Sequence, residues 1–300
     1  MKAKTADKIA TAVLYIIAGA IVVLLAAFII YLLYEGRESL NFSFIFGNNV
    51  LGGDGGGIGP QLFNTVYLLI ISLIITVPIG VGAGIYLAEY AGNGKIVEII
   101  RLCIETMSSL PSIVVGLFGL LVFVTYAGWR YSIIAGALSV GILNLPYITR
   151  ISENAIRAAS KNIKEASLGL GATRWQTVIY IILPAAFPDL LTGLILASGR
   201  IFGEAASLLY TAGMTAPRVH YYLFNLFSQS PSAQMSAFNL FRPAETLAVY
   251  IYSLNAESIV SDTTKIINGT AAVLIILVLI FNFGARFLGN YIHKRYTGEK

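Results

Sequence analysis

The sequence is poor in the residue types that build most metal and disulfide sites. Its 300 residues include one cysteine, Cys103, and two histidines, His220 and His293. A single thiol excludes an internal disulfide and any site with several cysteine ligands. The histidines are far apart in the sequence, and the topology derived below places them on opposite sides of a membrane. We therefore expect no metal site.

Charged side chains are also scarce. They make up 12% of the chain, whereas hydrophobic residues make up 57% and the mean hydropathy is +0.77. Soluble domains carry about 25% charged residues. The composition therefore predicts an all-α membrane protein that crosses the bilayer several times. The net charge of +5 says less than the distribution of the charges along the chain.

Nucleotide-binding motifs are missing as well. The glycine-rich stretch Gly52–Pro60 lacks the Lys-Ser/Thr ending of a phosphate-binding loop, and a plain flexible loop is the favoured interpretation. Gly92–Lys95 is followed by Ile96, so it is not a Walker A motif either. Since no cluster of histidine, serine and carboxylate residues is visible, we do not expect an enzyme.

Long apolar runs dominate what is present, and six of them have roughly the length needed to cross a bilayer. They are Ile9–Tyr34, Leu62–Ala88, Leu110–Tyr126, Ile133–Tyr147, Pro184–Leu209 and Ile266–Leu288. The first is too long for the apolar region of a signal peptide, so we predict an uncleaved span. The fourth is expected to break near Asn144–Pro146, and Arg150–Leu168 is expected to form a separate amphipathic helix.

Three segments follow from these spans: an N-terminal transmembrane helix (1–34), an extracytoplasmic loop (35–61) and the main membrane domain (62–300). That domain contains a cytoplasmic loop at 150–184. Gly80, Gly82 and Gly84 are expected to let the second span approach a neighbouring helix. Trp129–Tyr131 is predicted to form a tight outer turn, and 213–262 a long outer segment. Its apolar piece, Thr246–Leu254, is too short to span and is expected to lie at the interface or docked on protein.

Basic residues predict the orientation of the spans. If the N-terminus lies inside, 14 of the 20 lysines and arginines fall on inner segments. Cytoplasmic segments of membrane proteins are enriched in these residues. Both termini are therefore predicted to be cytoplasmic, and so is the loop at 150–184.

One stretch of that loop, Glu165–Pro184, has the sequence EASLGLGATRWQTVIYIILP. Gly169 and Gly171 are expected to end a first helix, because glycine readily adopts the left-handed conformation of helix C-termini. Thr173 followed by Gln176 is a capping-box pattern and predicts that a second helix begins there.

The spacing E-A-S-x3-G-x9-I-x-L-P resembles the EAA loop of ABC importer membrane subunits, with Ser167 in place of the second alanine. The resemblance implies a MetI-like core of the type I ABC importer permeases and a loop that docks into a cleft of an ATPase subunit. It implies a polar contact at Glu165, small residues close to the partner at Ala166 and Ser167, and a turn at Gly171, with Arg174 nearby. A mere interfacial connector is the structural alternative.

Three further stretches, Gly84–Ala91, Leu110–Gly119 and Gly199–Ala206, are similar to the PstA permeases of phosphate importers. That resemblance implies a prokaryotic plasma-membrane complex with a second permease (PstC), an ATPase dimer (PstB) and an extracytoplasmic phosphate-binding protein (PstS). This chain would bind no cofactor, since ATP and magnesium belong to the ATPase. A PstC-type permease, a permease for sulfate or molybdate, and a secondary transporter are the alternatives.

Arg200 and Glu204 are the charged residues of the fifth span's outer half. An arginine in the hydrocarbon region costs several kcal/mol unless it is paired or faces water. The spacing of four puts Glu204 on the same helical face. We predict that Arg200 offers its guanidinium to phosphate in the translocation path, and that Glu204 holds it when the path is empty. The structural alternative is an ion pair at the outer interface. Asn144 is a weaker path candidate.

Overall fold

The structure is a computed structural model, and it describes residues 2–48, 56–92, 94–217, 219–221, 225–257 and 261–297. In these ranges the regular secondary structure is entirely helical. Five helices are long and apolar enough to cross a membrane, and α4 with α5, bent by 98° at their junction, gives a sixth candidate. The chain is thus an all-α membrane protein, as predicted.

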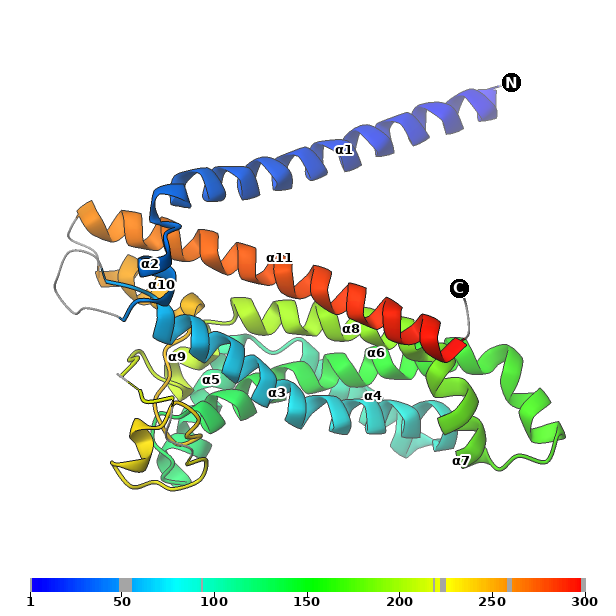
Figure 1. The fold of residues 1–300 in the computed structure, drawn as a ribbon. Coiled ribbons are helices and arrows are strands. Elements are labelled where there is room, and N and C mark those ends of the chain that lie inside the picture. Colours follow the sequence, from blue (N-terminus) through cyan, green and yellow to red (C-terminus); the bar gives the residue numbers. More distant parts are fainter. Residues whose placement is uncertain are drawn as a thin grey trace.

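Helices α3, α6 and α11 run along the length of a single bundle (Figure 1). We call the end with the starts of α3 and α6 the outer end, following the orientation predicted from the basic residues. The elements in chain order are α1 (Lys2–Gly36), η1 (Arg37–Ser39), α2 (Phe42–Phe46), α3 (Gly59–Ile85), η2 (Tyr86–Tyr90), α4 (Lys95–Ser108), α5 (Ser112–Gly119), η3 (Leu120–Tyr126), α6 (Ile133–Gly169), α7 (Arg174–Thr177), η4 (Val178–Ile182), α8 (Leu183–Gly203), α9 (Ala206–Thr211), η5 (Ala233–Met235), α10 (Leu247–Glu257) and α11 (Ser261–Thr297).

Helix α1 touches the bundle only near its C-terminal end and diverges from it toward the N-terminus (Figure 1). At the contact, a Cβ on Gly36 would lie 2.5 Å from the backbone oxygen of Asn268 on α11. No residue in the apolar window of α1 is buried. Its side chains are therefore free to face lipid or another subunit.

The close contact between α3 and α6 depends on glycine. A Cβ on Gly80 would lie 2.7 Å from Ile148, and one on Gly84 would lie 2.4 Å from Ser152. Gly80 and Gly84 form a G-x-x-x-G pair, whose missing side chains let two membrane helices approach closely. The sequence prediction is confirmed for these two glycines, whereas Gly82 has no atom within 4 Å of its Cβ position.

Helix α6 corrects the prediction of a broken fourth span. It is one helix from Ile133 to Gly169, with Pro146 inside it, and it joins the predicted span to the predicted amphipathic helix. Contacts with α3 on both sides of the proline hold the helix in place: a Cβ on Gly141 would lie 2.9 Å from Thr76 before it, and Ile148 packs on Gly80 after it. Packing thus outweighs the local disruption by one proline.

The fifth span is interrupted, contrary to the prediction. Helix α8 ends at Gly203, and Glu204 has an extended backbone with ψ 119° before α9 begins at Ala206. The Glu204 carboxylate accepts a hydrogen bond from the backbone N–H of Ser207 at 3.0 Å. Carboxylates are favourable at helix N-termini, so Glu204 stabilises the start of the new helix.

The outer segment folds back onto the outer end of the bundle. Its helix α10 docks on protein, with Leu247 and Val249 fully buried, which confirms that this piece does not span. Arg242 is also fully buried; it donates to the carbonyls of Ala237 and Pro243 and, at 2.7 Å, to Asn64 of α3. Burial lowers the pKa of Arg242 to about 10, so the guanidinium is still charged at neutral pH.

Replacing Gly84 with leucine should separate α3 from α6, because the new side chain meets the backbone of Glu153 as well as Ser152. Overpacking of this kind costs about 1–3 kcal/mol or more. We expect a lower yield of folded protein and a lower thermal midpoint in detergent. Gly82→Leu, two residues away on an open face, is the matched control and should behave like the wild type. Equal stability of both variants would show that the contact does not hold the bundle together.

Candidate functional site

Arg200 lies level with the outer half of α6. Helices α6 and α8 run in opposite directions, and Gly193 of α8 meets Ile151 of α6. Arg200, seven residues after Gly193, therefore lies opposite residue 144, seven residues before Ile151. Asn144 is 11 positions after Ile133, or about 16 Å at 1.5 Å per residue. The hydrocarbon core of a bilayer is about 30 Å thick. If the outer edge of the core lies at Ile133, the backbone of Arg200 is near the middle of the membrane.

The side chain of Arg200 is exposed on the surface of this chain and lies over Tyr147 of α6, with its guanidinium carbon 5.3 Å from the ring centroid. A cation over an aromatic ring is stabilised by about 0.5–2 kcal/mol, which helps to hold the guanidinium in place. Within the part of the chain that the structure describes, the hydrogen-bond donors of the fork have no partner. Arg200 can thus bind an anion without first breaking an ion pair of its own.

The other exposed residues of α8 follow the same face. Their spacing of three or four residues forms one stripe along the helix, made of Ala185, Asp189, Thr192, Leu196, Arg200 and Gly203. Two charges and a hydroxyl on a membrane-spanning surface are unfavourable against lipid chains. This stripe therefore has to face water or another protein.

Glu204 is not the partner of Arg200, which corrects the predicted pairing. The helix ends between the two residues, so they do not share a helical face, and the Glu204 carboxylate instead caps α9. Within the described residues, the ion pairs of this chain do not include one between Arg200 and Glu204. The spacing rule failed because it assumes a continuous helix.

Asn144 is also separated from the exposed stripe. It is 2% exposed and donates to the carbonyl of Val140 at 3.2 Å, inside the helix packing. Its side-chain oxygen is buried without a hydrogen-bond partner in the described part of the chain. In this conformation Asn144 does not meet Arg200 on a common surface.

The loop at Glu165–Pro184 has the local structure that its sequence predicts. Helix α6 ends at Gly169, Gly171 has a left-handed φ of 88°, and the capping box of Thr173 and Gln176 is formed. Among the residues implied to face a partner, Glu165, Ala166, Gly171 and Arg174 are exposed. The loop thus presents four of the five residues at the surface.

Ser167 is the exception. It is 4% exposed, and its hydroxyl lies 2.9 Å from that of Thr177, so it joins the two arms of the loop to each other. The hydroxyl of Ser167 is thus used inside this chain, and its approach to a partner stays a prediction. This hydrogen bond gives a physical reason for serine at this position of the motif.

Two apolar residues at the loop were missed from the sequence. Leu170 is 91% exposed and Trp175 is 61% exposed, on either side of the Gly171 turn. Large apolar side chains this exposed, away from the membrane-spanning part, indicate a protein contact. The available signal was a leucine and a tryptophan in an otherwise small and polar loop.

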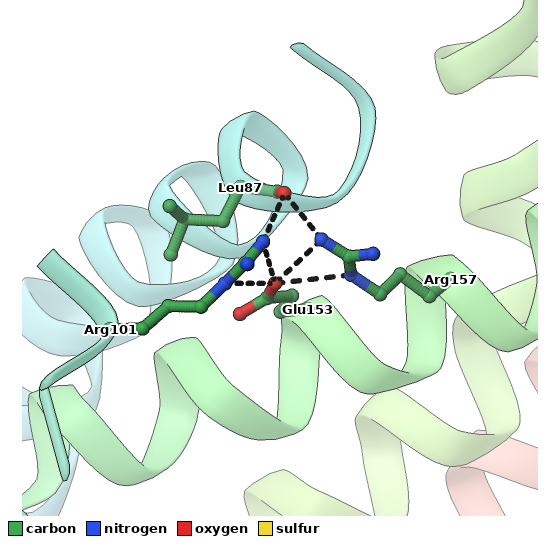
Figure 2. Close-up of polar contacts among 4 residues, drawn as sticks. All are labelled: Leu87, Arg101, Glu153 and Arg157. Atoms are coloured by element: carbon green, nitrogen blue, oxygen red, sulfur yellow. Dashed lines mark hydrogen bonds and ion pairs between the residues drawn. The ribbon is translucent and has the colours of Figure 1, made fainter. Parts of the chain in front are cut away.

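A charge cluster joins three elements at the inner end of the bundle (Figure 2). One oxygen of Glu153 accepts from Arg101 of α4 at 2.9 Å and from Arg157 of α6 at 3.0 Å. Both arginines also donate to the carbonyl of Leu87 in η2, at 3.5 and 3.0 Å. The Gly84 contact one turn earlier brings Glu153 close enough to the end of α3 for these bonds to form.

A second ion pair lies nearer to the loop. Lys164 of α6 is 2.6 Å from Glu89, whose side chain is 4% exposed. Glu89 belongs to η2, directly after α3, and Lys164 directly precedes Glu165 of the loop. The loop is thereby attached to the inner end of α3 as well as to its own helix.

The family of the chain follows from comparison with known proteins. Residues 80–298 match the model of the binding-protein-dependent transport system inner membrane component family. The chain belongs to this family. It is therefore a membrane-embedded permease subunit of an ABC importer, with the MetI-like fold expected from its loop, and not an enzyme by family.

Several individual proteins are similar to this chain. The chain is 49% identical over the full length of both sequences to a probable ABC transporter permease protein, YqgI, of Bacillus subtilis. It is 30% identical to the phosphate transport system permease protein PstA of Xylella fastidiosa, over 78% of this chain and 75% of that one. A chain of a bacterial alginate ABC transporter shares the fold, with a TM-score of 0.62, 15% identity and 96% of each chain covered.

Removing the Glu153 carboxylate should loosen the inner end of the bundle, because two neighbouring guanidiniums would then repel each other. Since the Arg101 and Arg157 side chains are 36% and 46% exposed, we expect a cost of about 1–3 kcal/mol, below that of a fully buried pair. Glu153→Gln should lower the thermal midpoint of the purified subunit complex.

Glu105→Gln is the control for that variant, because Glu105 pairs with Arg150 at a longer 3.7 Å with both side chains more than half exposed. It should leave the midpoint nearly unchanged. If the Glu153 and Glu105 variants are equally stable, the cluster does not join the three elements.

Proposed function

We propose that this chain is the PstA-type permease subunit of an ATP-driven phosphate importer. The observation that carries the proposal is an exposed arginine at mid-membrane depth on the stripe of α8, without an ion-pair partner among the described residues. The similarity to PstA permeases points to phosphate as the anion. The partners would be a PstC-like permease, a PstB-like ATPase dimer and a PstS-like phosphate-binding protein on the outer side.

In this mechanism, the α8 stripe faces the second permease and lines the translocation path. Arg200 offers the planar, two-pronged donor set that suits a phosphate oxygen pair. Tyr147 holds the guanidinium while the path is empty. Glu204 does not contact the anion in this mechanism. Its hydrogen bond to the start of α9 fixes the break in the chain directly after α8, the helix that contains Arg200.

The loop at Glu165–Pro184 supplies the coupling to ATP hydrolysis. Leu170 and Trp175 insert into a cleft of the ATPase, with Glu165 and Arg174 as polar contacts around them. The ATP and magnesium belong to that partner. Because α6 is one continuous helix from Ile133 to Gly169, a displacement of the loop moves the part of α6 that packs on α8. The path then alternates between inward- and outward-facing states.

Substitution of Arg200 tests the path. Arg200→Ala removes the guanidinium, and Arg200→Lys keeps a charge without the fork. Since a charge-assisted hydrogen bond contributes about 1.5–3 kcal/mol, phosphate uptake by the reconstituted importer should fall at least about tenfold in the alanine variant. Competition by sulfate and molybdate identifies the preferred oxyanion. Wild-type uptake by both variants, with normal assembly, would rule out the role of Arg200.

Gly171 tests the coupling. A leucine there must adopt a left-handed backbone, which costs about 1–3 kcal/mol in a non-glycine residue. Gly171→Leu should insert normally but hydrolyse ATP with little phosphate transported per ATP. Gly169→Ala, in a helical glycine with no atom within 4 Å of its Cβ position, is the control. Coupled uptake by the Gly171 variant would count against docking through this turn.

A further inference from the structure

A cavity of about 360 Å³ lies at the outer end of the bundle, next to the turn before α6 and the chain after α9. Its wall combines two turns and the outer segment, and includes Arg130, Tyr131, Gly213, Thr215, Gln234 and Phe241. The first turn connects η3 to α6, and the second follows α9. In the predicted orientation, the cavity opens on the side from which substrate arrives.

The backbone of Arg130 is constrained. Its φ is 58°, and it is the one non-glycine residue with a positive φ in the part of the chain that the structure describes. Arginine rarely adopts this conformation, and such residues persist only where the surroundings enforce them, often at functional sites. Gly128 and Gly213, with φ of 69° and 94°, shape the same two turns.

Neighbouring contacts hold the Arg130 turn in place. Trp129 stacks on Phe123 at 5.8 Å and meets Phe241 edge-on at 5.9 Å. On the other side of Arg130, the backbone N–H of Ser132 donates to the carbonyl of Thr211 at 3.0 Å. The turn is thus fixed to α9 and to the outer segment, and the position of the arginine is set before any ligand arrives.

The charged residue that lines the cavity is basic. The residues that line it include Arg130 and the polar residues Tyr131, Thr215 and Gln234, and no acidic residue is among them. Among the described residues, Arg130 has no hydrogen-bond or ion-pair partner. The smaller inner cavity of about 220 Å³ is different, because the carboxylates of Glu105 and Glu153 balance its two arginines there. The outer cavity is instead lined by an arginine that has no partner among the described residues, together with neutral polar residues.

We propose that the outer cavity is an acceptor site for a tetrahedral oxyanion such as inorganic phosphate, with Arg130 as its binding residue. This inference rests on the proposed transport function and adds a binding step to it. The anion released at the outer surface binds Arg130 first and then moves along α9 and α8 to Arg200. Leu209, on the cavity wall, is nine residues after Arg200 along that route.

Arg130→Asn tests the proposal, because asparagine tolerates the left-handed backbone but has no charge. In proteoliposomes that contain the complete importer, we expect phosphate uptake to fall about tenfold while the thermal midpoint stays equal or rises. Arg37→Gln is the control: Arg37 is an outer-end arginine that lies over Tyr34 instead of a cavity, and its variant should transport normally. Wild-type uptake by Arg130→Asn would overturn the proposal.

Two further measurements separate the oxyanion from other ligands of Arg130. The uptake defect should be the same in vesicles of phosphatidylcholine alone and in vesicles that also contain phosphatidylglycerol; a defect confined to the anionic vesicles would assign Arg130 to lipid headgroups. The affinity of the phosphate-binding protein for the complex should be unchanged. Weaker docking in the variant would make Arg130 a protein contact and overturn the acceptor site.

Comparing the Arg130 and Arg200 variants distinguishes failure of the acceptor site from failure of the proposed transport function. If Arg200→Ala abolishes phosphate uptake and Arg130→Asn does not, the acceptor site is wrong and the proposed function stands. If the wild-type importer takes up another oxyanion instead, the same pair of variants is tested with that anion. A loss in both variants supports a route through both arginines.

Discussion

The rest of the structure depends on the close approach of α3 and α6. Gly80 and Gly84 have no side chain, so α6 lies directly against them through Ile148 and Ser152. In lipid there is little hydrophobic drive to associate helices, and close van der Waals packing has to supply the attraction. This contact explains why α6 can be one long helix in spite of Pro146.

The buried and half-buried charges follow from that packing. At the inner end, the contact brings Glu153 close to the carbonyl of Leu87 in η2, directly after α3, and two arginines bind both groups (Figure 2). At the outer end, Arg242 satisfies its donors on carbonyls and on Asn64. Charges in low dielectric are tolerated when they are paired and hydrogen-bonded. The guanidiniums of Arg200 and Arg130, by contrast, have no such partner among the described residues.

Much of the fold was predictable from the sequence. The long apolar runs, the glycine pair of the second span, the capping box at Thr173 and the turn at Gly171 were all predicted, and the structure contains them. These features are local, since each depends on residues within one helix or one turn. The orientation of the chain stays a prediction, because it rests on the distribution of basic residues alone.

By itself, the sequence determined the all-α membrane class, the family and the presence of an arginine in an apolar span. Only the tertiary structure decided which polar residues meet. It ended α8 at Gly203 and so separated Glu204 from Arg200, it turned Ser167 toward Thr177, and it assembled Glu153 with Arg101 from another helix. Helical periodicity relates residues three or four positions apart, whereas these contacts are set by how whole helices pack and where they break.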